Sequence, residues 1–155
     1  MSFKFRLQRI LELREQAEQA KARALAAAQA EADKAQEAKD ILAAMRSDSR
    51  SQLESATVSS PRIGHLMQLG AAIDALDARL ERADDDLKAA EIVVDEAKAR
   101  LEVAARDRRV LDRLKDRHAE HWRAEEAQKD RLLMDEVALM QFARKTDTNN
   151  QDSQS

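Results

Sequence analysis

A seven-residue repeat in the second half of the chain constrains the fold more than any other feature. From Leu66 to Leu111, 13 of the 14 a and d positions of one heptad register are apolar, with Arg108 as the single interruption, although only 43% of the residues are hydrophobic. The chance of this in a fixed register is on the order of 1 in 10,000, so the repeat predicts a long helix packed as a coiled coil. The a positions are Leu66, Ile73, Leu80, Leu87, Val94 and Leu101, and the d positions are Leu69, Leu76, Ala83, Ala90, Ala97, Ala104 and Leu111.

The first third of the chain carries a weaker form of the same pattern. It contains neither Gly nor Pro before Pro61 and is rich in Ala, Glu, Gln, Lys and Arg, which are the best helix formers. This composition predicts one helix over about residues 3–57. The candidate residues of its seam, the apolar stripe that contacts the partner helix, are Phe3, Leu7, Ile10, Ala17, Ala24, Ala28, Ala35, Ala38, Leu42 and Met45.

The only strong helix-breaking signal lies between these two segments. Several serines precede Pro61, the single proline, and Gly64 follows it. Ser60 is a good N-cap and Pro suits the first position of a helix, so we expect the second helix over about residues 61–144. A short connection makes the two helices antiparallel, with position i facing about position 120 minus i. The predicted fold is therefore all-α: a single domain over residues 3–145 in which two long helices form an antiparallel coiled-coil hairpin.

The second helix is longer than the first and should extend past it as a C-terminal helical overhang. In this scheme residues 118–145 have no intrachain partner, so their apolar side chains must lie exposed or meet another molecule. Trp122, the only tryptophan, is a candidate anchor for a partner protein, because desolvated tryptophan dominates many interfaces. Residues 146–155 contain no hydrophobic residue, and we expect a disordered tail there.

Composition argues against several functional classes. There is no Cys, no apolar run approaches the roughly 20 residues of a membrane span, and the N-terminus lacks the apolar core of a signal peptide, so we expect a cytoplasmic location. Two isolated glycines cannot make a nucleotide-binding loop, and a two-helix rod has no pocket for catalytic groups. We therefore expect neither enzymatic activity nor a cofactor.

Two clusters of possible metal ligands are better explained as solvated helix faces. His118, His121 and Glu125 have helical spacing, yet a single exposed helix supplies too few converging ligands. The adjacent carboxylates of residues 84–86 splay over a wide arc of a helix. We expect no metal site.

The net charge of -3 conceals opposite charges in the two halves of the predicted hairpin. Residues 1–23 and 98–117, away from the turn, total +7, whereas residues 24–46 and 74–96, near the turn, total -7. Acidic residues interrupt the basic stretch 106–117 and aromatic residues for base stacking are absent from it, so we expect no nucleic-acid binding. A bipolar charge distribution suits orientation between two different partners.

Three segments in order resemble the flagellar export protein FliJ family. They are the opening Phe3-Lys4-Phe5-Arg6-Leu7-Gln8-Arg9-Ile10-Leu11-Glu12-Leu13-Arg14-Glu15, the heptad Leu69, Ile73, Leu76 and Leu80 after a Ser/Pro turn, and Met134-Asp135-Glu136-Val137-Ala138. The resemblance covers about residues 3–145.

This resemblance implies a component of the flagellar type III export apparatus, an antiparallel coiled coil similar to the stalk of rotary ATPases. It further implies binding to the hexameric export ATPase and to the cytoplasmic domain of the export gate protein, escort of export chaperones, and a location peripheral to the inner membrane at the flagellar base. The gate contact in the family involves the middle of the hairpin, which carries over to Leu69, Ile73, Leu76 and Leu80. The same four residues also belong to the predicted seam, which explains their apolar character equally well.

From the charge distribution we expect the basic end of the hairpin to enter an acidic surface of the ATPase ring. The arginines concerned are Arg6, Arg9, Arg14, Arg108, Arg109 and Arg113. In this reading the chain is an elongated monomer. The alternative is a passive coiled-coil scaffold unrelated to secretion, which would homodimerise through residues 118–145.

Overall fold

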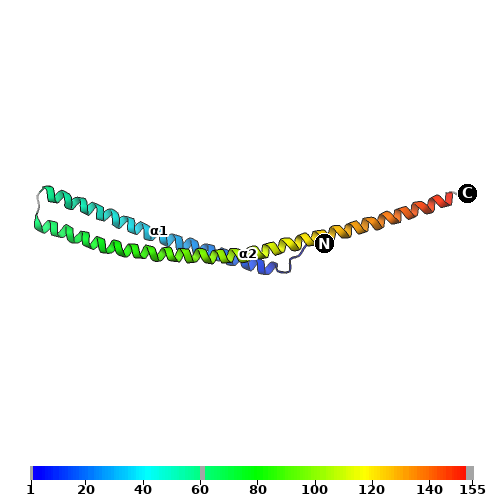
Figure 1. Ribbon diagram of the computed structural model, residues 1–155, viewed down its shortest axis with the longest axis horizontal. Coiled ribbons are helices and arrows are strands. Elements are labelled where there is room, and N and C mark those ends of the chain that lie inside the picture. The colour runs from blue at the N-terminus through cyan, green and yellow to red at the C-terminus, as the bar shows by residue number, and fades with distance from the viewer. Residues whose placement is uncertain (1, 60–61, 153–155) are drawn as a thin grey trace. The chain divides into compact units, whose positions relative to one another are not determined.

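Two long helices account for most of the chain. The computed structural model describes residues 2–59 and 62–152, with α1 spanning Gln8–Ser59 and α2 spanning Ile63–Asp152 (Figure 1). Neither helix contains Pro, and α1 also lacks Gly, so little in either sequence opposes helical backbone. No strand occurs within the described ranges. The predicted all-α hairpin of two helices is confirmed.

The helix ends differ from the predicted ones at both termini of the chain. Residues 2–7 are not helical; a turn closed by the Gln8 N–H donating to the Phe5 carbonyl at 3.1 Å leads into α1. At the other end α2 continues past residue 144 to Asp152, through much of the expected tail. The hydroxyls of Thr146 and Thr148 donate to backbone carbonyls four residues earlier, as threonine does inside a helix. The predicted cap Ser60, Pro61 and the last three residues lie outside the described residues.

Packing divides the chain into two compact units. We call residues 14–107 the coiled-coil unit, and residues 1–13 together with residues 108–155 the terminal unit. The sequence had suggested one domain over residues 3–145. Each unit contains a stretch of α1 and a stretch of α2.

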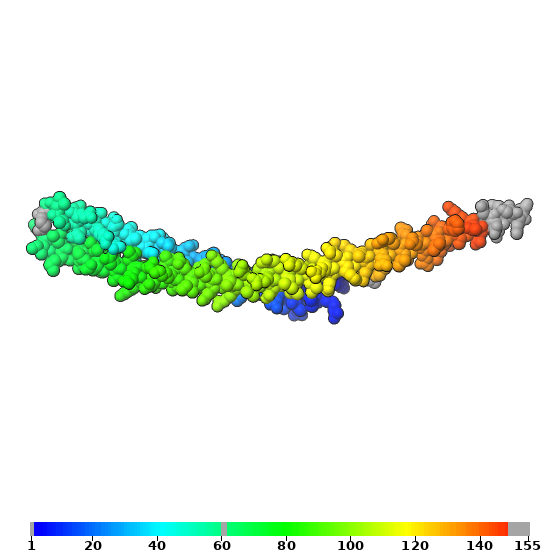
Figure 2. All heavy atoms as spheres, viewed as in Figure 1, coloured from blue at the N-terminus to red at the C-terminus, as the bar shows by residue number. Residues whose placement is uncertain are grey.

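In the coiled-coil unit, α2 uses the seam that the heptad predicts. Every one of the predicted a and d positions from Leu66 to Ala104, and Leu111 in the terminal unit, is buried or half-buried. The best covered are Ile73, Leu76, Ala83, Leu87 and Ala97, each 7–8% exposed. Figure 2 shows the cyan part of α1 packed along the green part of α2. Burial of this stripe supplies the hydrophobic stabilisation of the pair.

The seam of α1 differs from the predicted one. Ile10, Ala17, Ala24, Ala38 and Met45 are exposed, so these five predictions were wrong, whereas the other five are buried or half-buried. One row of the observed seam recurs every seven residues and contains Leu11, Glu18, Leu25, Ala32, Lys39, Arg46 and Leu53. A second row contains Ala28, Ala35, Leu42, Ser49 and Ala56. Charged side chains therefore occupy seam positions that a search for apolar residues passes over.

Ion pairs between the helices establish the antiparallel register. Lys39 contacts Asp84 at 2.7 Å, and Arg46, one heptad later in α1, pairs with Asp77, one heptad earlier in α2. The expected partner of Lys39 was position 81, so the observed register differs from the prediction by about one helical turn. These pairs place the two basic groups of the α1 seam, Lys39 and Arg46, against carboxylates from α2.

Gly70 lowers the stability of α2, and replacing it with alanine should stabilise the helix. A Cβ built at this position meets nothing within 4 Å, and its φ is not positive, so Ala fits without strain. We expect Gly70→Ala to raise the free energy of unfolding by about 0.5–1 kcal/mol, because Ala loses less backbone entropy on folding. Urea titration followed by circular dichroism at 222 nm measures this. A smaller gain is expected for Gly64→Ala in the first turn of α2, and a loss of stability in Gly70→Ala would contradict the packing described.

Candidate partner-binding surfaces

The four residues assigned to the gate contact lie in the seam. Ile73 and Leu76 are buried against α1, and Leu69 and Leu80 are half-buried. A partner therefore reaches Ile73 and Leu76 only if α1 separates from α2. The large apolar side chains that are openly exposed in this part of α2 are Ile63 and Met67, one helical turn apart, which the sequence argument did not select. Both residues lie outside the a and d positions of the heptad. Large apolar residues at such positions are not needed for the seam, and this feature of the sequence could have identified them.

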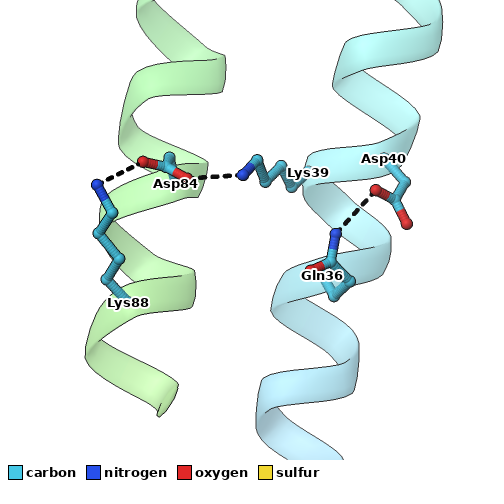
Figure 3. Close-up of polar contacts among 5 residues, drawn as sticks. All are labelled: Gln36, Lys39, Asp40, Asp84 and Lys88. Atoms are coloured by element: carbon cyan, nitrogen blue, oxygen red, sulfur yellow. Dashed lines mark hydrogen bonds and ion pairs between the residues drawn. The ribbon is translucent and has the colours of Figure 1, made fainter. Parts of the chain in front are cut away.

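A three-residue charge network crosses the coiled-coil unit near its middle. Asp84 on α2 accepts a hydrogen bond from Lys39 Nζ of α1 through Oδ1 and pairs with Lys88 Nζ at 2.8 Å through Oδ2 (Figure 3). Hydrogen bonds from Lys39 first and Lys88 second lower the pKa of Asp84 to about 2. On α1, Gln36 donates to Asp40 at 2.9 Å, outside this network. The carboxylate of Asp84 thus links the two helices electrostatically.

The lowered pKa of Asp84 predicts a pH-dependent contribution to stability. A carboxylate whose pKa falls from 3.8 to about 2 on folding stabilises the fold above the unfolded value and loses that effect as the pH falls through about 2. We expect Asp84→Asn to be less stable than the wild type at pH 7, with the difference shrinking between pH 4 and pH 2. Urea unfolding midpoints at pH 7, 4, 3 and 2 test this. A difference that stays constant over this range would contradict the role of the charge.

The six arginines assigned to the ATPase contact differ in their surroundings. Arg14 belongs to the coiled-coil unit, where it pairs with Asp107 at 3.4 Å. The other five belong to the terminal unit, and within it Arg108 pairs with Asp112. The exposed arginines for which the structure gives no ion pair among its described residues are Arg6, Arg9 and Arg113. These three are the most available to an acidic partner.

Trp122 has an intramolecular neighbour within the terminal unit. Its ring centroid lies 6.1 Å from that of Phe3, and the buried ring of Phe5 packs edge-on against His118 at 5.7 Å. The expectation that residues 118–145 have no intrachain partner was therefore wrong for His118 and Trp122. The reason is the register: Lys115 Nζ donates to Gln8 Oε1 at 2.8 Å, so position i lies opposite about position 123 minus i and not 120 minus i, which brings the first residues of the chain opposite His118 and beyond. Trp122 remains half-buried.

Beyond this contact α2 presents an exposed apolar surface. Every side chain described from residue 131 to residue 148 is exposed. The large apolar ones, which we call the C-terminal apolar surface, are Leu132, Leu133, Met134, Val137, Leu139, Met140 and Phe142. Clusters of exposed apolar side chains mark sites of protein interaction more often than chance.

The candidate metal ligands do not assemble into a site. His121 Nδ1 lies 3.3 Å from Glu125, and Asp84 is engaged by two lysines. In the part of the chain that the structure describes, no group of three or more His, Cys, Asp or Glu side chains converges in a way that would hold a metal ion. Within the same residues, neither helix has a stretch apolar enough to cross a membrane.

Comparison with known proteins identifies one family. The sequence model of the family described as "Flagellar FliJ protein" matches residues 3–147. This range includes nearly all of α1 and α2. No curated protein and no solved structure matches the chain.

Proposed function

The chain belongs to the flagellar FliJ family, and from that premise we propose that it is a non-enzymatic coiled-coil stalk linking the export ATPase ring to the membrane export gate. Family membership itself makes it a component of the flagellar export apparatus. The observation that best supports the proposal is the match of the family model to residues 3–147, a range that includes residues of both helices of the hairpin. Two helices held together by a continuous apolar seam can transmit a displacement from one binding partner to the other.

We assign the ATPase contact to the basic face of the terminal unit. Arg6, Arg9 and Arg113 are exposed there and can approach acidic side chains of a partner. Long-range attraction of this kind raises association rates and orients the encounter. Arg108 and Arg109 add positive charge within the terminal unit, although both also take part in intramolecular interactions. Arg14 belongs to the coiled-coil unit and pairs there with Asp107.

We assign the gate contact to the coiled-coil unit around Leu69, Ile73, Leu76 and Leu80. Because the seam covers these side chains, the contact is best made through their exposed neighbours, of which Ile63 and Met67 are the large apolar ones. The four seam residues then act by fixing the helix that presents this surface. Substitutions at Met67 should accordingly weaken gate binding without unfolding the hairpin.

Escort of export chaperones is the third part of the proposal. The C-terminal apolar surface and the half-buried Trp122 offer an area in the terminal unit for these proteins. In this account the chain works in the cytoplasm and reaches the inner membrane at the flagellar base only through its partners.

Co-purification of the chain with the flagellar ATPase and, separately, with the cytoplasmic domain of the gate protein tests the proposal. We expect each to be retained by the wild-type chain. Trp122→Ala is expected to reduce chaperone retention while leaving gate binding unchanged, since the two surfaces belong to different units. If the chain failed to retain either one of these two partners, the result would contradict the proposal.

A passive scaffold that homodimerises is the second candidate, and the C-terminal apolar surface is the observation that favours it. Sedimentation equilibrium separates the two, because a stalk is a monomer and the scaffold would dimerise through residues 118–145. A dimer dissociated by Leu133→Glu would support the scaffold. A monomer at micromolar concentrations would support the stalk.

A further inference from the structure

A groove runs beside the seam of the coiled-coil unit, at the end of that unit remote from the hairpin turn. Its apolar lining comes from Ala17 of α1 and from Ala99, Val103 and Ala104 of α2. Val103 is 55% exposed although it is a β-branched apolar residue. Three of the four apolar residues are alanines, so another helix can approach this pair closely, at the near end of the usual 8–10 Å spacing.

Basic side chains flank this apolar lining. Lys21 from α1 and Arg100 from α2 line the groove from its two walls, and neither has an ion pair among the described residues. Arg14 and Asp107 also line it, but they pair with each other at 3.4 Å and so contribute little net charge. The groove therefore combines an apolar lining with a net positive charge contributed by Lys21 and Arg100.

We propose that this groove, formed by α1 and α2 around Val103, docks an amphipathic helix of a partner protein whose small apolar stripe is flanked by acidic residues. The apolar stripe covers Val103 and the alanines, and the flanking carboxylates meet Lys21 and Arg100. Residues 99–107 extend about 12 Å along α2 at 1.5 Å per residue, so two to three turns of the partner suffice. The assembly is a local three-helix coiled coil. This inference does not depend on the role of the chain in flagellar export.

A designed peptide provides the test. The probe is a fluorescein-labelled helix of three heptads with Leu and Ala at its seam and Glu at the flanking positions. The comparison peptide is identical except that Lys replaces Glu, and circular dichroism verifies equal helicity. Binding to the full chain is measured by fluorescence anisotropy. We expect the Glu peptide to bind at least tenfold more tightly than the Lys peptide, and the difference to shrink from 50 to 500 mM NaCl.

Two matched variants locate the binding site. Val103→Glu should weaken binding of the Glu peptide at least tenfold, because it places a carboxylate in the apolar lining. Val93→Glu makes the same change on the same helix at a similarly exposed position, 52% against 55%, that does not line the groove, and should leave binding unchanged. Thermal melts of both variants verify folding.

Three results would overturn the proposal: equal binding of the two peptides, no binding of the Glu peptide at millimolar concentration, or equal affinities of the two variants. A dimer of the chain that Val103→Glu dissociates would also overturn it, because a second copy would then occupy the groove.

Discussion

Replacing Leu11 by Ala is expected to lower the free energy of unfolding of the terminal unit by about 2–4 kcal/mol. Leu11 is 2% exposed and is the most fully buried large side chain among the described residues. The substitution removes apolar contacts and leaves a cavity that two helices can close only partly. Since Trp122 is the only tryptophan and belongs to the same unit, its fluorescence during urea unfolding reports this change directly.

Leu13→Ala is the matched control for this prediction. It makes the same change two residues later on the same helix, at a side chain that is 57% exposed. Its effect should stay within about 0.5 kcal/mol, as is usual for exposed sites. Equal effects of the two substitutions would mean that α1 does not present Leu11 to α2.

Reversing the charge of Arg6, Arg9 and Arg113 together is expected to weaken binding to the export ATPase about 100-fold at low salt. Each reversal replaces an attraction with a repulsion, worth about 1 kcal/mol at an exposed site. The three arginines have no ion pair among the described residues, so their loss removes no intramolecular bridge given by the structure. Titration of labelled chain with the ATPase at 50 mM NaCl measures the affinity.

The control is a triple reversal of equal net charge elsewhere. Arg62, Arg79 and Arg82 are exposed residues of the coiled-coil unit, in the half of the chain near the hairpin turn. Arg62→Glu, Arg79→Glu and Arg82→Glu together should change the ATPase affinity only a few-fold, through the net charge. If both triple variants lost affinity equally, the attraction would be a property of the whole chain and the assignment of the ring contact would be wrong.

How much of the fold was predictable depended on which residues occupy the seam. The α2 seam is apolar at every a and d position from Leu66 to Ala104, and Arg108 is the first exception, so the heptad period located these positions. The α1 seam includes Lys39 and Arg46, whose charges are satisfied by Asp84 and Asp77 across the interface. Such pairs are visible only once the register of the two helices is known, and a single helix sequence does not contain that information.

The N-terminus shows the same dependence on tertiary contacts. Phe3 and Phe5 were placed in a helix because no residue there breaks one, yet both rings pack on α2 from a non-helical segment. Burial of two aromatic rings outweighs the small helix preference of a few residues. For the candidate sites, the sequence proposed the basic residues and Trp122, which stay predictions, and it did not show which arginines form internal pairs, since that depends on side-chain geometry.

A bridging experiment tests whether this one chain links the ATPase to the gate. The gate cytoplasmic domain is immobilised, and retention of the ATPase hexamer is measured with and without the chain. We predict that the wild-type chain increases ATPase retention severalfold, and that the triple Arg6, Arg9 and Arg113 reversal abolishes this increase while remaining bound to the gate itself. Binding of the ATPase and the gate domain in competition with each other, with no increase in retention, would contradict the claim.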